Sequence, residues 1–190
     1  MNKGVLLIVC GPSGVGKTSL CDELLADQPH LQPSISYTTR EPRGDEVDDF
    51  DYHFVTDAEF EQLREEDAFV EWAEVHGHYY GTTRATIERA WESGTDVMFD
   101  IDYQGARQLQ NAFEEAVSVL VVPPSMEELE RRLRGRATDT ARHELSQYEL
   151  FDYIVENDDF DDALADLRDI YHATRHRTPL RQQLLEKLLS

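Results

Sequence analysis

The chain has 190 residues and a mass of 21.9 kDa, which suits one domain with small insertions. Asp and Glu number 39 against 18 Lys and Arg, so the net charge is −21, which disfavours general binding to nucleic acid or to anionic membranes. No apolar run approaches the roughly 18 residues of a membrane span, and the segment before the first apolar run is too short for a signal peptide. We therefore expect a cytoplasmic protein that binds neither nucleic acid nor membrane.

The basic residues bear on the salt environment of the protein, and the cysteines bear on its redox compartment. The basic residues comprise 15 Arg and only 3 Lys. Two interpretations of this acidic, lysine-poor surface stay open: adaptation to high salt, where ions screen self-repulsion, or an ordinary acidic cytosolic protein. Cys10 and Cys21 have neither metal-ligand nor redox spacing, so we expect two small buried side chains in a reducing compartment.

The first 83 residues predict one strand–helix unit followed by a small sheet. Residues 5–10 form an apolar run typical of a buried parallel strand, a glycine-rich turn follows, and a helix begins at Lys17. A second helix, with Thr56 as N-cap and Glu59 completing a capping box, interrupts the small sheet. The expected strands of this mostly antiparallel sheet are residues 34–39, 52–55, 69–75 and 78–81.

From residue 84 onward, helices and buried strands alternate. Gly94 suits the C′ position of the first helix, Ser125 and Glu128 predict another capping box, and Pro179 opens a terminal amphipathic helix. The stretch 135–147 is polar, and no helix or strand is assigned to it. The expected helices are 84–93, 103–113, 126–134 and 161–176, and the expected strands are 96–101, 118–122 and 151–156.

This order of elements predicts an α/β fold, in which helices cover both faces of a parallel sheet. Residues 34–83 interrupt the rhythm after the first strand–helix unit. We interpret them as an insertion mounted on a core of residues 1–33 and 84–190, and not as a second independent domain.

A phosphate-binding loop joins the first strand to the first helix and matches G-x-x-x-x-G-K-[ST]. It consists of Gly11, Pro12, Ser13, Gly14, Val15, Gly16, Lys17 and Thr18. The glycines let backbone N–H groups point at phosphate oxygens, and the helix N-terminus adds a partial positive charge. We expect Lys17 to reach the β- and γ-phosphates of ATP and the Thr18 hydroxyl to hold Mg²⁺.

Arginines supply further candidates, because the guanidinium fork suits phosphate oxygens better than a lysine does. Arg40 and Arg43 lie in the insertion, and Arg142 stands alone in the polar stretch. A third group closes the helix after Ser125 and consists of Arg131, Arg132, Arg134 and Arg136.

Several sequence strings, taken together, resemble guanylate kinases. Besides the phosphate loop they are residues 36–47 (SYTTREPRGDEV), 79–82 (YYGT), 100–106 (DIDYQGA), 123–125 (PPS) and 157–159 (NDD). The phosphate loop alone occurs in many families, whereas the T-T-R-x-P-R, Y-Y-G-T and D-I-D-x-Q-G strings in this order are highly specific. The resemblance runs over about residues 4–171, nearly the whole chain.

The resemblance implies a three-part P-loop kinase that transfers the γ-phosphoryl group of ATP to GMP, and to dGMP, giving ADP and GDP. The core holds ATP, residues 34–83 hold GMP, and a lid at about 135–147 closes over both. On the family's pattern, Ser36, Glu71 and Thr82 match the residues that read guanine. The remaining expected GMP-binding residues are Arg40, Arg43, Tyr52 and Tyr80, which match those on the phosphate, together with Gly81 and Asp102.

On the ATP side, the resemblance implies residues that act on the transferring phosphates and the metal. The expected catalytic residues are Lys17, Arg40, Asp100, Arg132 and Arg136. Asp100 matches an acidic residue near the metal, so Thr18 and Asp100 are the expected Mg²⁺ ligands, and Asn157 matches a position near the adenine. Structural roles for Asp100 and Asp102, such as holding an arginine or a backbone amide, stay open.

The chemistry of guanine supports the role of Glu71 without the family. Guanine presents N1–H and the N2 amino group as donors, and one carboxylate can accept both, whereas adenine has an acceptor at N1 and no amino group at C2. Each charged hydrogen bond left unmade in a buried site costs about 1.5–3 kcal/mol, so such a site can discriminate by roughly 10⁴.

The lid departs from the family's pattern, because about ten residues are absent after residues 138–140. The missing stretch normally holds an arginine that reaches the phosphates. Two explanations stay open: the chain lacks a loop that the whole protein carries, which we favour, or the lid is truly trimmed. Arg142 is a candidate substitute, but its neighbours match a later part of the helix.

Two other functions stay open beside the kinase. Guanylate-kinase-like scaffold modules bind peptides in the cleft, but they usually lose the lysine or glycines of the phosphate loop, which this chain keeps. A kinase for another small acceptor is disfavoured by the set Ser36, Glu71 and Thr82. The terminal helix can pack on the core or pair subunits, so both a monomer and a homo-oligomer stay open.

Overall fold

Two sheets organise the fold in a computed structural model that describes residues 3–75, 77–133 and 138–189, with backbone alone for residues 183–185. The larger sheet is parallel, with the strand order β2-β7-β1-β8-β9. Its strands are β1 (Leu6–Cys10), β2 (Leu31–Pro33), β7 (Asp96–Asp100), β8 (Val117–Val122) and β9 (Tyr153–Glu156). The α/β class predicted from the sequence is confirmed.

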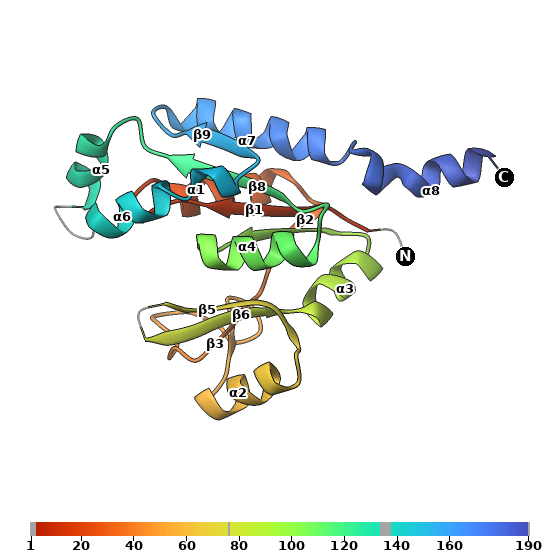
Figure 1. The fold of residues 1–190 in the computed structure, drawn as a ribbon, viewed down its shortest axis with the longest axis horizontal. Helices are drawn as coiled ribbons and strands as arrows, with labels where there is room; N and C mark the ends of the chain where they lie inside the picture. Colours follow the sequence, from red (N-terminus) through yellow and green to blue (C-terminus); the bar gives the residue numbers. More distant parts are fainter. Residues whose placement is uncertain (1–2, 76, 134–137, 190) are drawn as a thin grey trace.

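Helices cover both faces of this sheet (Figure 1). The described helices are α1 (Lys17–Asp27), α2 (Asp57–Glu65), α3 (Arg84–Glu92), α4 (Tyr103–Ala112), α5 (Met126–Leu133), α6 (Thr138–Leu145), α7 (Phe160–Thr174) and α8 (Thr178–Leu189), of which α2 lies on the smaller sheet and not on this one. The central strand β1 alternates between two apolar clusters, because Leu7 and Val9 pack with α1 and α7, whereas Leu6, Ile8 and Cys10 pack with α3 and α4. A strand buried on both faces is what a continuous apolar run predicts.

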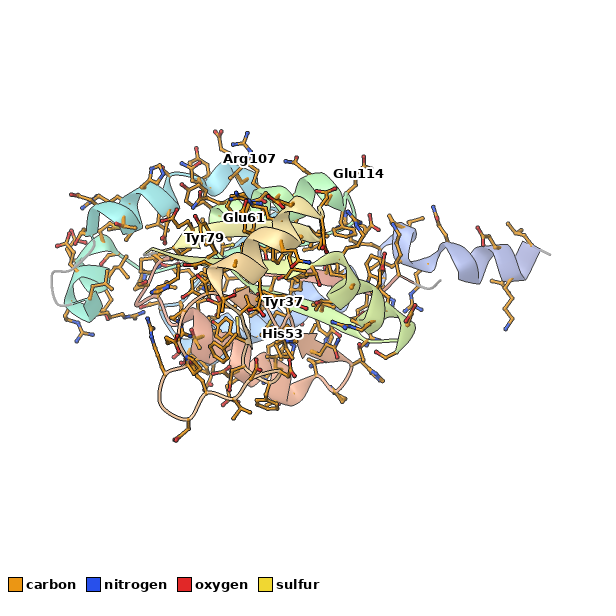
Figure 2. All side chains as sticks on the ribbon, turned by 90° about the horizontal axis from the view of Figure 1, so that it is seen from below. Tyr37, His53, Glu61, Tyr79, Arg107 and Glu114 are labelled. Carbon is orange, nitrogen blue, oxygen red and sulfur yellow. The ribbon has the colours of Figure 1, made fainter. Side chains whose placement is uncertain are left out.

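The smaller sheet lies on the far side of α4 from the larger one (Figure 1) and has the strand order β4-β3-β6-β5. Its strands are β3 (Tyr37–Thr38), β4 (His53–Phe54), β5 (Phe69–Val75) and β6 (His78–Thr83). The β3–β6 and β5–β6 pairs are antiparallel, as predicted, whereas β3 and β4 pair in parallel. Tyr37 and His53 face each other across that pair, with ring centroids 4.5 Å apart (Figure 2).

The strand expected at residues 34–39 is much shorter than predicted. Residues Leu31–Pro33 form β2, which the sequence did not predict, and pair with β7 of the larger sheet. The Ser34 N–H still donates to the carbonyl of Met98 in β7, so the chain leaves the larger sheet only after this point. The division into a core and an insertion with boundaries at 33/34 and 83/84 stays a prediction.

Helix caps follow the sequence closely. Thr56 forms the predicted capping box at the start of α2: its hydroxyl accepts the Glu59 N–H at 3.2 Å, and the Glu59 carboxylate accepts the Thr56 N–H at 2.8 Å. At α5 the Ser125 hydroxyl accepts the Glu128 N–H at 3.1 Å. The Glu128 carboxylate accepts hydrogen bonds from Arg131 and Arg132 instead of from the Ser125 N–H. In the described part of the chain, the second predicted capping box is therefore only half formed.

The polar stretch 135–147 holds a helix that the sequence analysis did not assign. Residues Thr138–Leu145 form α6, and a 3₁₀ turn, η1 (Tyr148–Leu150), follows. Within α6, Ala141 is buried and Leu145 packs against the apolar cluster of α3 and α4. Two inward residues give too weak an apolar period to detect in a polar segment, which is why the sequence analysis assigned no helix here.

The terminal helix α8 stands clear of the rest of the molecule in both views (Figures 1 and 2). Leu180, near its start, packs against the core cluster of α1 and α7, whereas Leu188 and Leu189 near its end are 72% and 87% exposed. Across the described residues, no helix combines the length and the apolar character that a bilayer crossing needs.

Candidate active site

A cavity of about 610 Å³ is lined by residues of both sheets and lies at the carboxyl ends of β1 and β7. This edge of a parallel sheet is where ligands of α/β proteins bind. The predicted site residues that line it are Gly11, Pro12, Ser13, Gly14, Gly16, Lys17, Thr18, Ser36, Tyr52, Glu71, Tyr80, Asp100 and Asp102. The predicted residues that do not line it are Val15, Arg40, Arg43, Gly81, Thr82, Arg132 and Asn157. Arg136 lies outside the described residues.

The phosphate loop needs its glycines for two physical reasons. Gly14 and Gly16 adopt φ values of 79° and 92°, which side chains with a Cβ rarely adopt. A Cβ on Gly16 would also lie 2.5 Å from the amide nitrogen of Asn157. The loop therefore turns sharply into α1, which begins at Lys17 with its N–H groups directed toward the cavity.

Asn157 holds the phosphate loop through a side-chain hydrogen bond. Its side chain is buried, and its amide donates to the Val15 carbonyl at 2.8 Å. Its backbone N–H donates to the carbonyl of Val122, which fixes the position of the side chain. The structure therefore assigns Asn157 to the loop and not to the cavity wall, and a contact with adenine does not follow from its position.

Lys17 forms an ion pair with Asp100, the last residue of β7. Burial lowers the pKa of Lys17, because removal from water penalises the charged ammonium. Thr18, the next residue of α1, also lines the cavity. Lys17 and Asp100 are thus in contact, and Thr18 lines the same cavity.

Glu71, on β5, is the most unusual side chain of the cavity. It is only 3% exposed, and its Oε1 atom has no hydrogen-bond partner among the described residues. Burial raises the pKa of Glu71 to about 7, and the Asp102 carboxylate adds to the rise, whereas Thr82 opposes it. A buried carboxyl oxygen without a partner indicates a site that a ligand with N–H donors completes.

A chain of hydroxyl groups lies beside Glu71. Thr82, buried on β6, is 3.0 Å from the hydroxyl of Ser34 and 3.2 Å from that of Ser36. Ser36 lines the cavity, so Thr82 stands behind it rather than in the wall. The sequence analysis missed Ser34; its two-residue spacing from Ser36, which places both on one side of an extended chain, was the available signal.

Asp102 has a structural role in addition to its place in the cavity wall. It is the N-cap of α4, and its carboxylate accepts the backbone N–H groups of Gln104 and Gly105 at 2.9 and 3.0 Å. The side-chain amide of Gln104 donates to the other carboxylate oxygen at 3.0 Å. The backbone-amide role that the sequence left open for Asp102 is therefore present in the structure.

Arg40 is held in place by several neighbours, and one of its terminal nitrogens donates to the Glu41 carbonyl at 2.8 Å. Both of its terminal nitrogens donate to the two carboxylate oxygens of Glu46 at 2.9 Å, and its Nε donates to the Tyr80 hydroxyl at 3.2 Å. The guanidinium also lies 5.3 Å from the ring centre of Tyr52. The Glu46 carboxylate raises the pKa of Arg40 further above its usual range.

Glu46 is a second residue without an assigned role in the sequence analysis. It accepts both the Arg40 fork and the backbone N–H of Arg43, at 2.7 Å. The Arg43 side chain is exposed and lies outside the cavity wall. A carboxylate in the loop that carries the two arginines expected to bind phosphate was the signal that could have identified Glu46.

Three of the candidate arginines, Arg131, Arg132 and Arg142, are paired with carboxylates among the described residues. Arg132 donates to Glu128 at 2.8 Å, and together with Arg131 it lowers the pKa of Glu128 to about 2. Arg142 lies 3.6 Å from Glu130 and is exposed. Neither guanidinium lines the cavity. Helix α5 nevertheless packs against the phosphate loop. A Cβ atom on Gly14 would lie 3.0 Å from the side chain of Leu133 and 3.7 Å from the Cβ of Arg132.

The charge of the cavity wall is unbalanced among the described residues. Lys17 is the one basic side chain of the wall, against four carboxylates. These carboxylates are Glu71, Asp100, Asp102 and Glu144. A phosphate-bearing ligand in this cavity would need positive charge in addition to that of Lys17.

The fold and the site together define a class of enzyme. A phosphate loop at the end of a parallel strand faces a second sheet that carries a buried, unpartnered carboxyl group and two tyrosines, and both line one cavity. This arrangement defines a P-loop kinase with a separate pocket for a small acceptor.

The chain belongs to the guanylate kinase family, whose profile (Guanylate kinase) matches residues 3–174. It is 50% identical to a guanylate kinase from Shewanella sp. (strain MR-7) over 184 residues, covering 91% of this chain and 89% of that protein. A guanylate kinase from Caulobacter vibrioides is 48% identical over 185 residues, with 92% and 87% covered. The activity of the chain is accordingly that of an ATP:GMP phosphotransferase.

Solved structures agree with this assignment. The crystal structure of guanylate kinase from Anaplasma phagocytophilum superimposes with a TM-score of 0.80 at 34% identity, covering 97% of this chain and 95% of that one. The SH3-kinase fragment of tight junction protein 3 superimposes with a TM-score of 0.51 at 13% identity, covering 93% and 58%, and shows the fold alone.

Proposed function

We propose that Glu71, Ser36 and Thr82 recognise the guanine base of GMP. The observation that carries this proposal is the buried Glu71 carboxyl group, which lines the cavity with an Oε1 atom that has no partner in the described structure. The N1–H and N2 amino groups of guanine donate in the same direction, so one ionised carboxylate accepts both. Ser36, backed by Thr82, offers a rotatable hydroxyl to the acceptors on the other edge of the base.

The GMP phosphate is assigned to the tyrosines and arginines of the smaller sheet. The Tyr80 hydroxyl accepts a hydrogen bond from Arg40, so its own hydrogen is available to a phosphate oxygen. Tyr52 lines the cavity beside it, and Arg40 contributes its charge and its remaining N–H. Arg43 reaches the same phosphate by rotation of its exposed side chain. Glu46 keeps the Arg40 fork oriented meanwhile.

ATP is assigned to the phosphate loop and α1. Backbone N–H groups of the loop bind its phosphates, and Lys17 exchanges Asp100 for the β- and γ-phosphate oxygens. Arg132 leaves Glu128 to stabilise the charge on the transferring group, and Arg136 keeps the same predicted role. With the base and phosphate of GMP positioned, a GMP phosphate oxygen attacks the γ-phosphorus of ATP, and the bond from this phosphorus to the β–γ bridging oxygen breaks as ADP leaves on the opposite side.

Mg²⁺ is the metal that the donor set fits. The Thr18 hydroxyl and the Asp100 carboxylate line one cavity beside Lys17, and Mg²⁺ binds few protein oxygens while keeping waters and substrate phosphates as its other ligands. These two residues would hold the ion, which neutralises phosphate charge when bound.

The assigned contacts also suggest the range of acceptors and the place of action. All of them address the base or the phosphate, so dGMP is proposed as a second acceptor. The cytoplasm, where ATP and GMP are available, is the proposed location.

The test measures ADP formation from ATP and Mg²⁺ with GMP, dGMP, AMP, CMP or UMP, for the natural chain and for Glu71→Gln. We expect turnover with GMP and dGMP only, and a fall of about 100-fold in kcat/KM for GMP in the variant, because the amide accepts with one oxygen and opposes an N–H to the guanine donors. Glu74→Gln, an exposed carboxylate on the same strand, is the matched control and should change kcat/KM less than about twofold. Equal values for the two variants would show that Glu71 does not read the base.

A further inference from the structure

Helix α4 lies between the two sheets (Figure 1), and its Gln108 side chain hydrogen-bonds to the smaller sheet. The Gln108 amide donates to the Trp72 carbonyl at 2.7 Å, and its oxygen accepts the Trp72 N–H at 3.2 Å. Trp72 is on β5, the strand that ends the sheet, so one side of its backbone has no strand partner among the residues that the structure describes. Gln108 therefore pairs with the open edge of β5 as a neighbouring strand would.

This grip lies next to the residue assigned to guanine. Trp72 follows Glu71 directly in β5. One turn before Gln108, Gly105 presents the same face of α4 to the same strand, and a Cβ there would lie 2.7 Å from the Glu71 Oε2 atom and 3.1 Å from Ile101. Helix α4 thus fixes the backbone beside Glu71 and also leaves the space that the Glu71 carboxylate occupies.

Gln108 itself does not line the cavity, and its hydrogen bonds are all made within the protein. Its amide nitrogen donates to the Gln104 carbonyl at 3.3 Å as well as to Trp72, so both donors and the acceptor are used. Gln104 in turn binds the Asp102 carboxylate through its own amide. The side chain consequently acts on a ligand only through the elements that it joins.

We propose that Gln108 is a positioning residue for guanine recognition, which ties β5 to α4 so that the Glu71 carboxylate is in place before GMP binds. The inference rests on the proposed role of Glu71. Without the tie, β5 is free to shift against α4, and part of the GMP binding energy is spent on ordering it. The phosphate loop lies on other elements, so ATP binding does not depend on Gln108.

Helix α4 offers a matched control two residues away. Gln110 is also half-buried, and its amide donates to the Ser118 hydroxyl and the Leu150 carbonyl, both at 2.8 Å, but these partners belong to the core. Gln108→Met and Gln110→Met each keep the length of the side chain and remove its hydrogen bonds. Steady-state kinetics with GMP and ATP, together with the melting temperature, compare the two variants in the full chain.

We expect Gln108→Met to raise the KM for GMP about tenfold, with the KM for ATP within about twofold, because two hydrogen bonds beside Glu71 are lost. Gln108→Met and Gln110→Met should lower the melting temperature by similar amounts, because each removes two half-buried hydrogen bonds. Gln110→Met should leave the KM for GMP within about twofold of the natural chain. A combination with Glu71→Gln closes a double-mutant cycle, in which Gln108→Met should add less than about threefold to the KM of the Glu71→Gln variant.

Equal KM values for GMP in the two methionine variants would overturn the positioning role, as would a full tenfold effect of Gln108→Met in the Glu71→Gln background. Failure of the proposed function looks different. In that case Glu71→Gln alone leaves the KM for GMP unchanged, whatever Gln108→Met does.

Discussion

The two halves of the cavity are built in different ways. On the ATP side, one continuous loop supplies backbone N–H groups, Lys17 and Thr18, and the strand and helix that flank it are buried parts of the larger sheet. On the GMP side, separate strands and a loop of the smaller sheet each contribute a side chain, and α4 of the core supports them. The phosphate loop of the first half is local in sequence, although Asp100 joins it from β7, whereas the second half exists only after the chain has folded.

This difference follows from what each half has to recognise. A phosphate is nearly symmetrical, so a turn of backbone N–H groups at a helix N-terminus is sufficient, and a contiguous motif encodes it. Guanine presents donors and acceptors at fixed angles, so side chains must approach from several directions. The GMP half should therefore be more sensitive than the ATP half to substitutions that shift one helix or strand against another.

The largest effect is expected from a substitution that impairs the ATP half alone. Lys17→Met should lower kcat by about 10²–10³, because one positive charge on the transferring phosphates is lost. GMP binding should change less than about threefold, since Lys17 contacts Asp100 and not the residues assigned to the base. Turnover assays and calorimetric titration with GMP measure the two quantities separately. A loss of GMP affinity as large as the loss of kcat would mean that the halves are not independent.

A smaller effect, of about tenfold per pH unit, should appear in the GMP half. The pKa of Glu71 is raised to about 7, so below pH 7 the empty folded protein holds this carboxyl protonated, and the proton must leave before guanine can donate two hydrogen bonds. The KM for GMP should therefore rise as the pH falls below 7 and level off above it. The KM for ATP should not follow this profile.

The control for the pH profile is Glu71→Gln. The phosphate of GMP also titrates near pH 6, and its contribution persists in the variant, whereas the contribution of Glu71 disappears. A profile that is the same in both proteins would assign the whole pH dependence to the nucleotide.

The smallest expected effect sharpens the description of the ATP half. Asn157→Ala leaves the Val15 carbonyl without its donor, so the variant should lose about 1–2 kcal/mol of stability and melt about 2–8 °C lower. The KM for ATP should rise severalfold through the loosened loop, and GTP as phosphoryl donor should be affected equally. If Asn157 instead contacts adenine, as its sequence position implied, the preference for ATP over GTP falls and the melting temperature does not.

Local sequence signals predicted most of the fold. The apolar runs of β1, β7 and β8, the capping box at Thr56 and the glycine after α3 are set by neighbours in the chain, and the structure contains each of them. The errors occur where tertiary contacts decide. β2 forms because β7 offers it an edge, and α6 forms because Ala141 and Leu145 reach the core.

The lid illustrates the same limit. The prediction that about ten residues of the family's pattern are absent after residues 138–140 comes from the sequence alone. The resemblance implies a lid arginine that this chain lacks, and Arg142 was the candidate substitute. In the structure the Arg142 side chain lies beside Glu130 and does not line the cavity.

The sequence by itself determined the phosphate loop, the identity of the candidate base-reading residues and the family, because each depends on residue type and spacing along the chain. Only the tertiary structure decided that Glu71 is buried with an unpartnered oxygen, that Asn157 supports the loop and that Gln108 joins α4 to β5. Burial and hydrogen bonds between distant segments depend on how the two sheets pack around α4, and no local pattern in the chain encodes that packing.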